Sequence, residues 1–168
     1  MIQIRPATAA DVPLIRAFIQ ELADYEREPD AVKITEAELL RDGFSDAGER
    51  YFACLIAEQD GEPAGFALYF PIYSTWRGRS LHLEDLFVRP AFRRLGIGRA
   101  LLQRVAALAV ERGCARLQWD VLAWNEPAIA VYRSLNAEML DEWRRMRVAD
   151  TSLAALSAAA DTEEKTKS

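Results

Sequence analysis

Residues 81–102 read LHLEDLFVRPAFRRLGIGRALL, and this stretch decides the fold. Its first half has the leucine, phenylalanine and valine content of a buried strand and stops at Pro90. Its second half supplies arginines and two glycines, followed by apolar residues at helical spacing. Glycines let a backbone approach a ligand closely, and the amides that begin a helix suit a phosphate. We therefore predict a strand, a basic anion-binding turn and a helix.

Three interpretations of the turn differ in the residues they require. A phosphate-binding loop of the Walker type needs lysine and a hydroxyl after the second glycine, and neither follows Gly98. A dinucleotide fingerprint needs a third glycine where Leu101 stands. The remaining pattern, Arg93-x-x-Gly96-x-Gly98 after a strand containing Glu84, resembles the acyl-CoA loop of the GNAT N-acetyltransferases. From these six residues alone, a plain strand-to-helix turn stays equally open.

The composition sets broad limits. The 168 residues suit one domain with a sizeable core, and a net charge of −5 argues against a nucleic-acid partner. An acidic protein is compatible with a cationic substrate. Cys54 and Cys114 stand at no motif spacing, so we expect buried, reduced thiols and no metal site. With no signal peptide and no apolar run of membrane length, we expect a cytoplasmic protein without membrane contact.

Apolar periodicity predicts the order β-α-α-β-β-β-α-β-α-β. This is a mixed α/β sheet, with an antiparallel meander first and a parallel pairing imposed later by crossover helices. We expect one domain over residues 1–149 and a disordered or weakly helical tail over residues 150–168. The expected strands are Ile2–Arg5, Tyr51–Glu58, Ala64–Tyr73, Ser80–Val88, Ala115–Leu122 and Met139–Val148, and the helices are 8–26, 35–43, 98–113 and 126–135.

Acetyl transfer from a thioester to an amine needs a proton acceptor, a donor to the carbonyl oxygen and a proton for the thiolate. Glu84 lies in the strand before the basic turn, where a carboxylate can take the amine proton. In a regular strand Asp85 points to the opposite face, and His82 shares a face with Glu84 as a supporting residue. Tyr132, on the helix after Asn125, is a candidate proton donor, although such tyrosines are more often core residues.

A wider resemblance covers the chain from Ile4 to Val148. The segments that carry it are Arg5–Asp11, Glu21–Glu26, Asp42–Phe44, Leu83–Val88 and Trp124–Pro127. Together they resemble the diamine (spermidine/spermine) N-acetyltransferase group within the GNAT superfamily.

The resemblance implies acetyl-CoA as co-substrate, a homodimer and a role for each matching residue. Glu84 becomes the base and an amine-site acid, and Tyr132 becomes the general acid. Leu86 and Val88, around Phe87, bind the pantetheine arm through their backbones. The implied pyrophosphate cradle is Arg93, Arg94, Leu95, Gly96, Ile97, Gly98 and Arg99. Further implied contacts are Asn125, Glu126, Pro127 and Ala128 beside the cofactor and Tyr25, Glu26 and Glu142 along the amine channel.

Three positions differ from that group. Arg94 and Asn136 stand where glycine is usual, and asparagine tolerates the left-handed conformation of a helix end. The segment between Asn136 and Trp143 is shorter, which favours a short diamine or a lysine-like amino acid over a long polyamine. We therefore expect an N-acetyltransferase for a small primary amine, acting by direct attack in a ternary complex. The alternatives are a protein or peptide N-acetyltransferase and a non-catalytic acyl-CoA-binding domain.

Overall fold

The structure is a computed structural model that describes the backbone of residues 1–166 and the side chains of residues 1–160. The chain divides into two units, Met1–Glu126 and Pro127–Ser168, and each is described separately. The first unit holds the whole sheet and most of the predicted site residues. The expectation of a single acetyltransferase domain over residues 1–149 stays a prediction.

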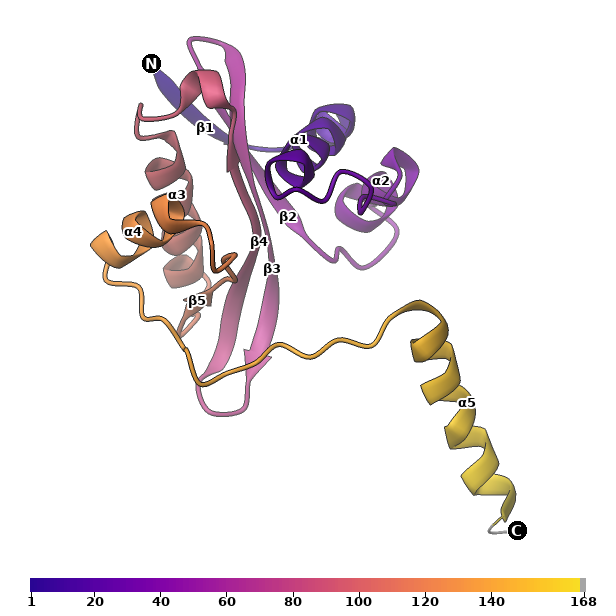
Figure 1. The fold of residues 1–168 in the computed structure, drawn as a ribbon. Coiled ribbons are helices and arrows are strands. Elements are labelled where there is room, and N and C mark those ends of the chain that lie inside the picture. Colours follow the sequence, from indigo (N-terminus) through magenta and orange to yellow (C-terminus); the bar gives the residue numbers. More distant parts are fainter. Residues whose placement is uncertain (167–168) are drawn as a thin grey trace. The chain divides into compact units, whose positions relative to one another are not determined.

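A five-stranded sheet runs through the first unit in the order β1-β2-β3-β4-β5 (Figure 1). Neighbours among the first four strands are antiparallel, and β4 pairs with β5 in parallel. The Asp60-Gly61 turn joins β2 to β3 with φ angles of 54° and 87°, which this residue pair accepts readily. The predicted mixed sheet is thus confirmed. Its strands are β1 (Ile2–Pro6), β2 (Ala53–Gln59), β3 (Glu62–Ser74), β4 (Gly78–Val88) and β5 (Leu117–Gln118).

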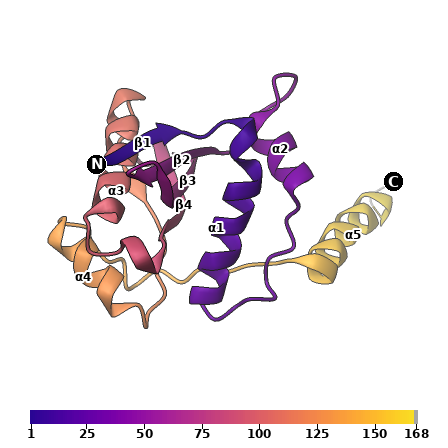
Figure 2. The same ribbon diagram turned by 90° about the horizontal axis from the view of Figure 1, so that it is seen from above.

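Helices α1 (Val12–Tyr25) and α2 (Glu36–Phe44) cover one face of the sheet (Figure 2). Phe18 of α1 is fully buried and stacks on Phe66 of β3, with ring centroids 5.3 Å apart. Gly43 was predicted to end α2, but it lies inside the last turn, where a side chain would collide with the ring of Phe52. Its small size therefore serves packing and not termination.

Helix α3 (Ile97–Glu111) covers the opposite face of the sheet (Figure 2). Ile97, Leu101 and Val105 are almost completely buried, at the spacing that the sequence predicts. Gly113 follows the helix with a φ of 67°, which confirms a glycine at its end. Because Ile97 is the first residue of α3, the helix is anchored in the core directly after the glycine turn.

The second unit contains most of α4 (Glu126–Ser134) and all of α5 (Asp150–Thr166). Asn136 follows α4 with a φ of 61°, so the predicted left-handed conformation is confirmed. Its neighbour Ala137 donates its backbone N–H to the carbonyl of Tyr132 over 3.1 Å, which closes the end of the helix.

Two strands expected in the C-terminal third differ from the structure. Residues 139–148 form no strand, and the strand expected over Ala115–Leu122 shrinks to Leu117–Gln118. Alternating apolar residues make a strand only when a neighbouring strand supplies hydrogen bonds. In the part of the chain described, β5 finds such partners only at Leu81 and His82 of β4, so it stays short. Of the two possibilities stated for the tail, disordered or weakly helical, residues 150–166 adopt the helix α5, because their alanine-rich composition has high helix propensity.

Candidate active site

The central feature of the site is a β-bulge in β4 at Glu84. Leu83 pairs with Tyr69 of β3 and Asp85 pairs with Leu68, so Glu84 has no partner in the register. The strand is therefore not regular, as the sequence interpretation assumed. His82 stacks on Phe70 and Asp85 lines a pocket with α1, which places both on the α1 face. The Glu84 side chain is 46% exposed, so a bound amine can reach its carboxylate.

Beyond the bulge, β4 presents an open backbone edge. Before it, the N–H of Leu81 donates to the carbonyl of Arg116 beside β5. After it, the N–H of Arg89 donates to the carbonyl of Ala64 beside β3. Because backbone groups alternate along a strand, the N–H and C=O of Phe87 also point toward β3, whereas those of Leu86 and Val88 point to the other edge. In the described residues β5 pairs only as far as His82. The backbone of Leu86 and the N–H of Val88 are thus available for a pantetheine arm, whereas the Val88 carbonyl already accepts from Arg93 and the Phe87 side chain is buried in the core.

The basic turn leads from β4 into α3 and presents backbone to the surface. Residues 93–96 are exposed, and Arg94 and Gly96 have φ angles of 66° and 84°. Gly96 is the N-cap of α3, and its carbonyl accepts the first helical hydrogen bond, from Ala100. The amides of the first helical turn need partners from outside the helix, and the local charge is positive. These are the features that a pyrophosphate needs, and the assignment of the turn to a pyrophosphate stays a prediction.

Arg93 has a second function, which is to connect the turn to α1. Its Nε donates to the carbonyl of Val88 over 3.1 Å, and its guanidinium lies 4.8 Å from the ring centroid of Tyr25. The Tyr25 hydroxyl donates to Oδ1 of Asn125 over 3.1 Å, and its ring lies 5.9 Å from that of Trp124. The structure therefore brings together Tyr25, Arg93 and Asn125, which the sequence assigned to three separate parts of the site.

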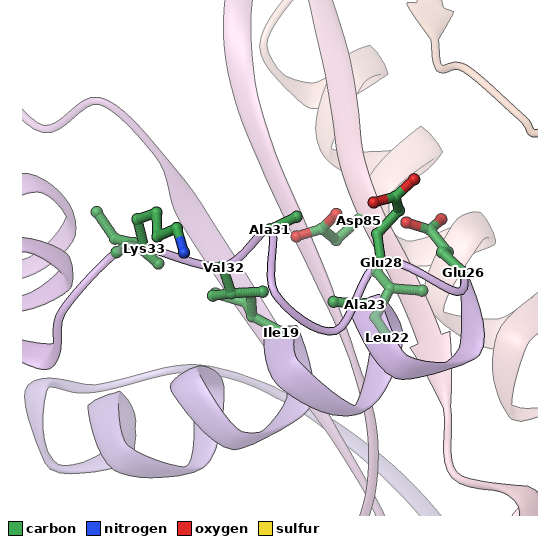
Figure 3. A pocket seen from close by; sticks show the side chains of 10 residues that line it. Ile19, Leu22, Ala23, Glu26, Glu28, Ala31, Val32, Lys33 and Asp85 are labelled. Atoms are coloured by element: carbon green, nitrogen blue, oxygen red, sulfur yellow. The ribbon is translucent and has the colours of Figure 1, made fainter. Parts of the chain in front are cut away.

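An acidic pocket of about 410 Å³ lies between α1, the segment that follows it and β4 (Figure 3). Its charged lining residues are Glu26, Glu28, Asp85 and Lys33. Burial and the nearby charge of Glu84 raise the pKa of Asp85 to about 7, and burial also raises the pKa of Glu26. The apolar lining residues are Ile19, Leu22, Ala23, Ala31, Val32 and Ile34.

The sequence interpretation placed Glu26 in this region but missed Glu28, Lys33 and Asp85. The adjacent acids Glu84 and Asp85 in an apolar strand were a usable signal for a buried carboxylate. Glu28 and Lys33 lie in an irregular segment, and no local pattern indicates which way such side chains point.

The second unit carries the remaining predicted residues. Pro127 and Ala128 lie in the first turn of α4, and Tyr132 lies farther along the same helix. Glu142 lies in the turn that the N–H of Trp143 closes on the carbonyl of Leu140. The roles of these residues in the site stay predictions.

Comparisons with known proteins agree with the geometry. Thialysine N-epsilon-acetyltransferase of Sus scrofa is 41% identical over 155 residues, which is 86% of this chain and 90% of that protein. Spermidine/spermine N(1)-acetyltransferase-like protein 1 of Homo sapiens is 41% identical over 142 residues, which is 80% of this chain and 20% of that protein. Among solved structures, an aminoglycoside N-acetyltransferase in complex with CoA shares the fold, with a TM-score of 0.69 and 22% identity over 90% of this chain and 95% of that one.

The family model decides the assignment. The model of the acetyltransferase (GNAT) family matches residues 15–137, which include most of α1, the Glu84 bulge, the basic turn and all of α4. GNAT acetyltransferases take the acetyl group from acetyl-CoA, and the curated relatives transfer it to amines of small molecules. The chain belongs to the GNAT family and is an acetyl-CoA-dependent N-acetyltransferase of small-molecule amines.

Proposed function

We propose that this enzyme acetylates the side-chain amine of a lysine-like diamino acid, such as thialysine. The observation that carries the proposal is the mixed charge of the acidic pocket. Three acidic side chains, those of Glu26, Glu28 and Asp85, suit a cationic amine, and Lys33 supplies one positive charge in the same lining. Several relatives are thialysine N-epsilon-acetyltransferases, which supports the same class.

The charges in the pocket are separated along its length. Figure 3 shows Lys33 at one end of the lining, Glu26 and Glu28 at the other end, and Asp85 between them. Asp85 adjoins Glu84 in the chain, so the acidic part of the lining leads toward the proposed base. A diamino acid can place its reacting amine at the acidic part and its carboxylate toward Lys33. A polyamine carries only positive charges and has no group for Lys33 to bind.

The proposed reaction needs no covalent enzyme intermediate. Glu84 takes a proton from the substrate ammonium, and the free amine attacks the thioester carbonyl. The open backbone edge at Leu86 supplies a donor for the carbonyl oxygen as negative charge develops there. Tyr132 gives its phenolic proton to the departing thiolate of coenzyme A. The proton that the attacking nitrogen still carries returns to the Tyr132 phenolate, while the first proton leaves Glu84 for the solvent. The acetyl carbon thus exchanges its sulfur for the amine nitrogen, and the products are an amide and free coenzyme A.

The experiment compares kcat/KM for thialysine, lysine, cadaverine (which is lysine without the carboxylate) and spermidine. Thialysine and lysine should exceed cadaverine by ~3- to 10-fold, which is what one exposed charge pair contributes. Lys33→Gln should remove this difference, and Glu28→Gln, as the matched control, should weaken all four cationic amines. A preference for spermidine of about tenfold or more would contradict the proposal. Failure of all four amines with acetyl-CoA still bound would favour a peptide acceptor.

We also propose that the enzyme is a cytoplasmic homodimer. Residues 139–148 carry Met139, Leu140, Trp143, Met146 and Val148 in a segment without regular structure, which a second copy can cover. No helix in the described part of the chain has the length and apolarity needed to cross a membrane. Light scattering at several concentrations tests the dimer, and Trp143→Ser should shift it toward monomer.

A further inference from the structure

The bulge at Glu84 brings its carboxylate beside a buried histidine on the same strand. Nε2 of His82 lies 3.3 Å from Oε2 of Glu84 and 4.0 Å from Oδ2 of Asp120. His82 is only 6% exposed, whereas the Glu84 side chain is 46% exposed. One partner is therefore fixed inside the protein and the other reaches the surface.

The imidazole ring is held from the neighbouring strand. His82 faces Phe70 in the register of β3 and β4, and the two rings stack with centroids 5.1 Å apart and an interplanar angle of 30°. A cross-strand ring pair of this kind restricts both side chains to one rotamer. The nitrogen that faces Glu84 thus has a defined position.

Glu84 needs such a partner because the bulge removes it from the strand register. An exposed glutamate rotates freely, and a base that is displaced by about 1 Å loses much of its effect. The imidazole nitrogen 3.3 Å from Oε2 limits this rotation.

We propose that His82 is a positioning residue for catalysis, which fixes the Glu84 carboxylate where the amine arrives. The inference rests on the proposed role of Glu84 as the base. The charge environment of the pair includes Asp120, which faces the same nitrogen, and Asp85, whose pKa is raised in part by the charge of Glu84. Both are acids, so His82 is the basic partner of Glu84 that the structure provides.

The experiment uses two substitutions at one position. His82→Phe keeps a ring against Phe70 and removes the nitrogen, whereas His82→Gln keeps an N–H donor and removes the ionisable group. His82→Phe should lower kcat by about 10- to 100-fold, the range for losing one contact to a charged group, with the KM for acetyl-CoA unchanged. His82→Gln should recover most of kcat, because its amide N–H can still donate to the Glu84 carboxylate.

Two controls separate this inference from the proposed function. Ser80→Ala alters the packing of β4 at another buried residue and should leave the kcat of the parent unchanged. Glu84→Gln should lower kcat strongly, and adding His82→Phe to it should lower kcat no further. If Glu84→Gln retains full activity, the base assignment is wrong. If Glu84→Gln is inactive but His82→Phe keeps the parent kcat, the base stands and the role of His82 is wrong.

Discussion

The guanidinium of Arg93 lies 4.8 Å from the ring centroid of Tyr25, so the basic turn before α3 contacts the last residue of α1. The same ring carries the hydroxyl that donates to Asn125. Tyr25 therefore connects three segments of the site that are far apart in the sequence.

Tyr25→Leu should weaken acetyl-CoA binding by about 3- to 30-fold, because a cation–π contact contributes about 0.5–2 kcal/mol. Tyr25→Phe keeps the ring beneath Arg93 and loses only the hydroxyl, so its affinity should stay closer to that of the parent. Isothermal titration with acetyl-CoA measures both. Equal affinities in the two variants would show that the ring contributes nothing.

Acetyl-CoA should raise the melting temperature by about 5–10 °C at a hundredfold excess over its Kd, because it binds only the folded chain. Gly96→Val should abolish this shift, because Gly96 has a φ of 84° at the start of α3 and valine cannot adopt it without strain. Gly98→Ala is the matched control, since a Cβ there would lie 3.6 Å from Val88 in ordinary contact. A full shift in Gly96→Val would contradict the assignment of the turn.

Asp85 should make the protein less stable as the pH rises. Its pKa of about 7 in the folded state exceeds the ordinary 3.8, so the folded state holds this proton more tightly than the unfolded state. The resulting stability is complete below the unfolded value and is lost as the pH rises through about 7. Asp85→Asn should therefore melt several degrees above the parent at pH 8, with a smaller difference at pH 5. A constant difference at both pH values would count against a buried, protonated Asp85.

Tyr132→Phe should lower kcat by about a hundred- to ten-thousand-fold, because general acid catalysis contributes on that scale. The ring is kept, so acetyl-CoA affinity should change by no more than a few-fold. Steady-state kinetics and a binding titration on one preparation separate the two effects. Near-full turnover in this variant would make Tyr132 a packing residue and leave the proton donor unidentified.

The fold of the first 113 residues could be predicted closely, because its helices and strands carry their own apolar periodicity and turn residues. The bulge at Glu84 could not, because it depends on how β4 pairs with β3 and not on the sequence of β4 alone. The strand expected over 139–148 failed for a related reason, since alternation supplies no hydrogen-bonding partner. The acidic pocket joins Glu26 to Asp85, and no local pattern reports a contact across that separation.

The most direct test of the account follows thiol release from acetyl-CoA with thialysine, in the parent and in Glu84→Gln, and analyses the product by mass spectrometry. The account predicts one thiol released for each thialysine acetylated on its side-chain nitrogen, no release without the amine, and a strong loss of kcat in Glu84→Gln. Thiol release that does not depend on the amine, or undiminished turnover in Glu84→Gln, would contradict it.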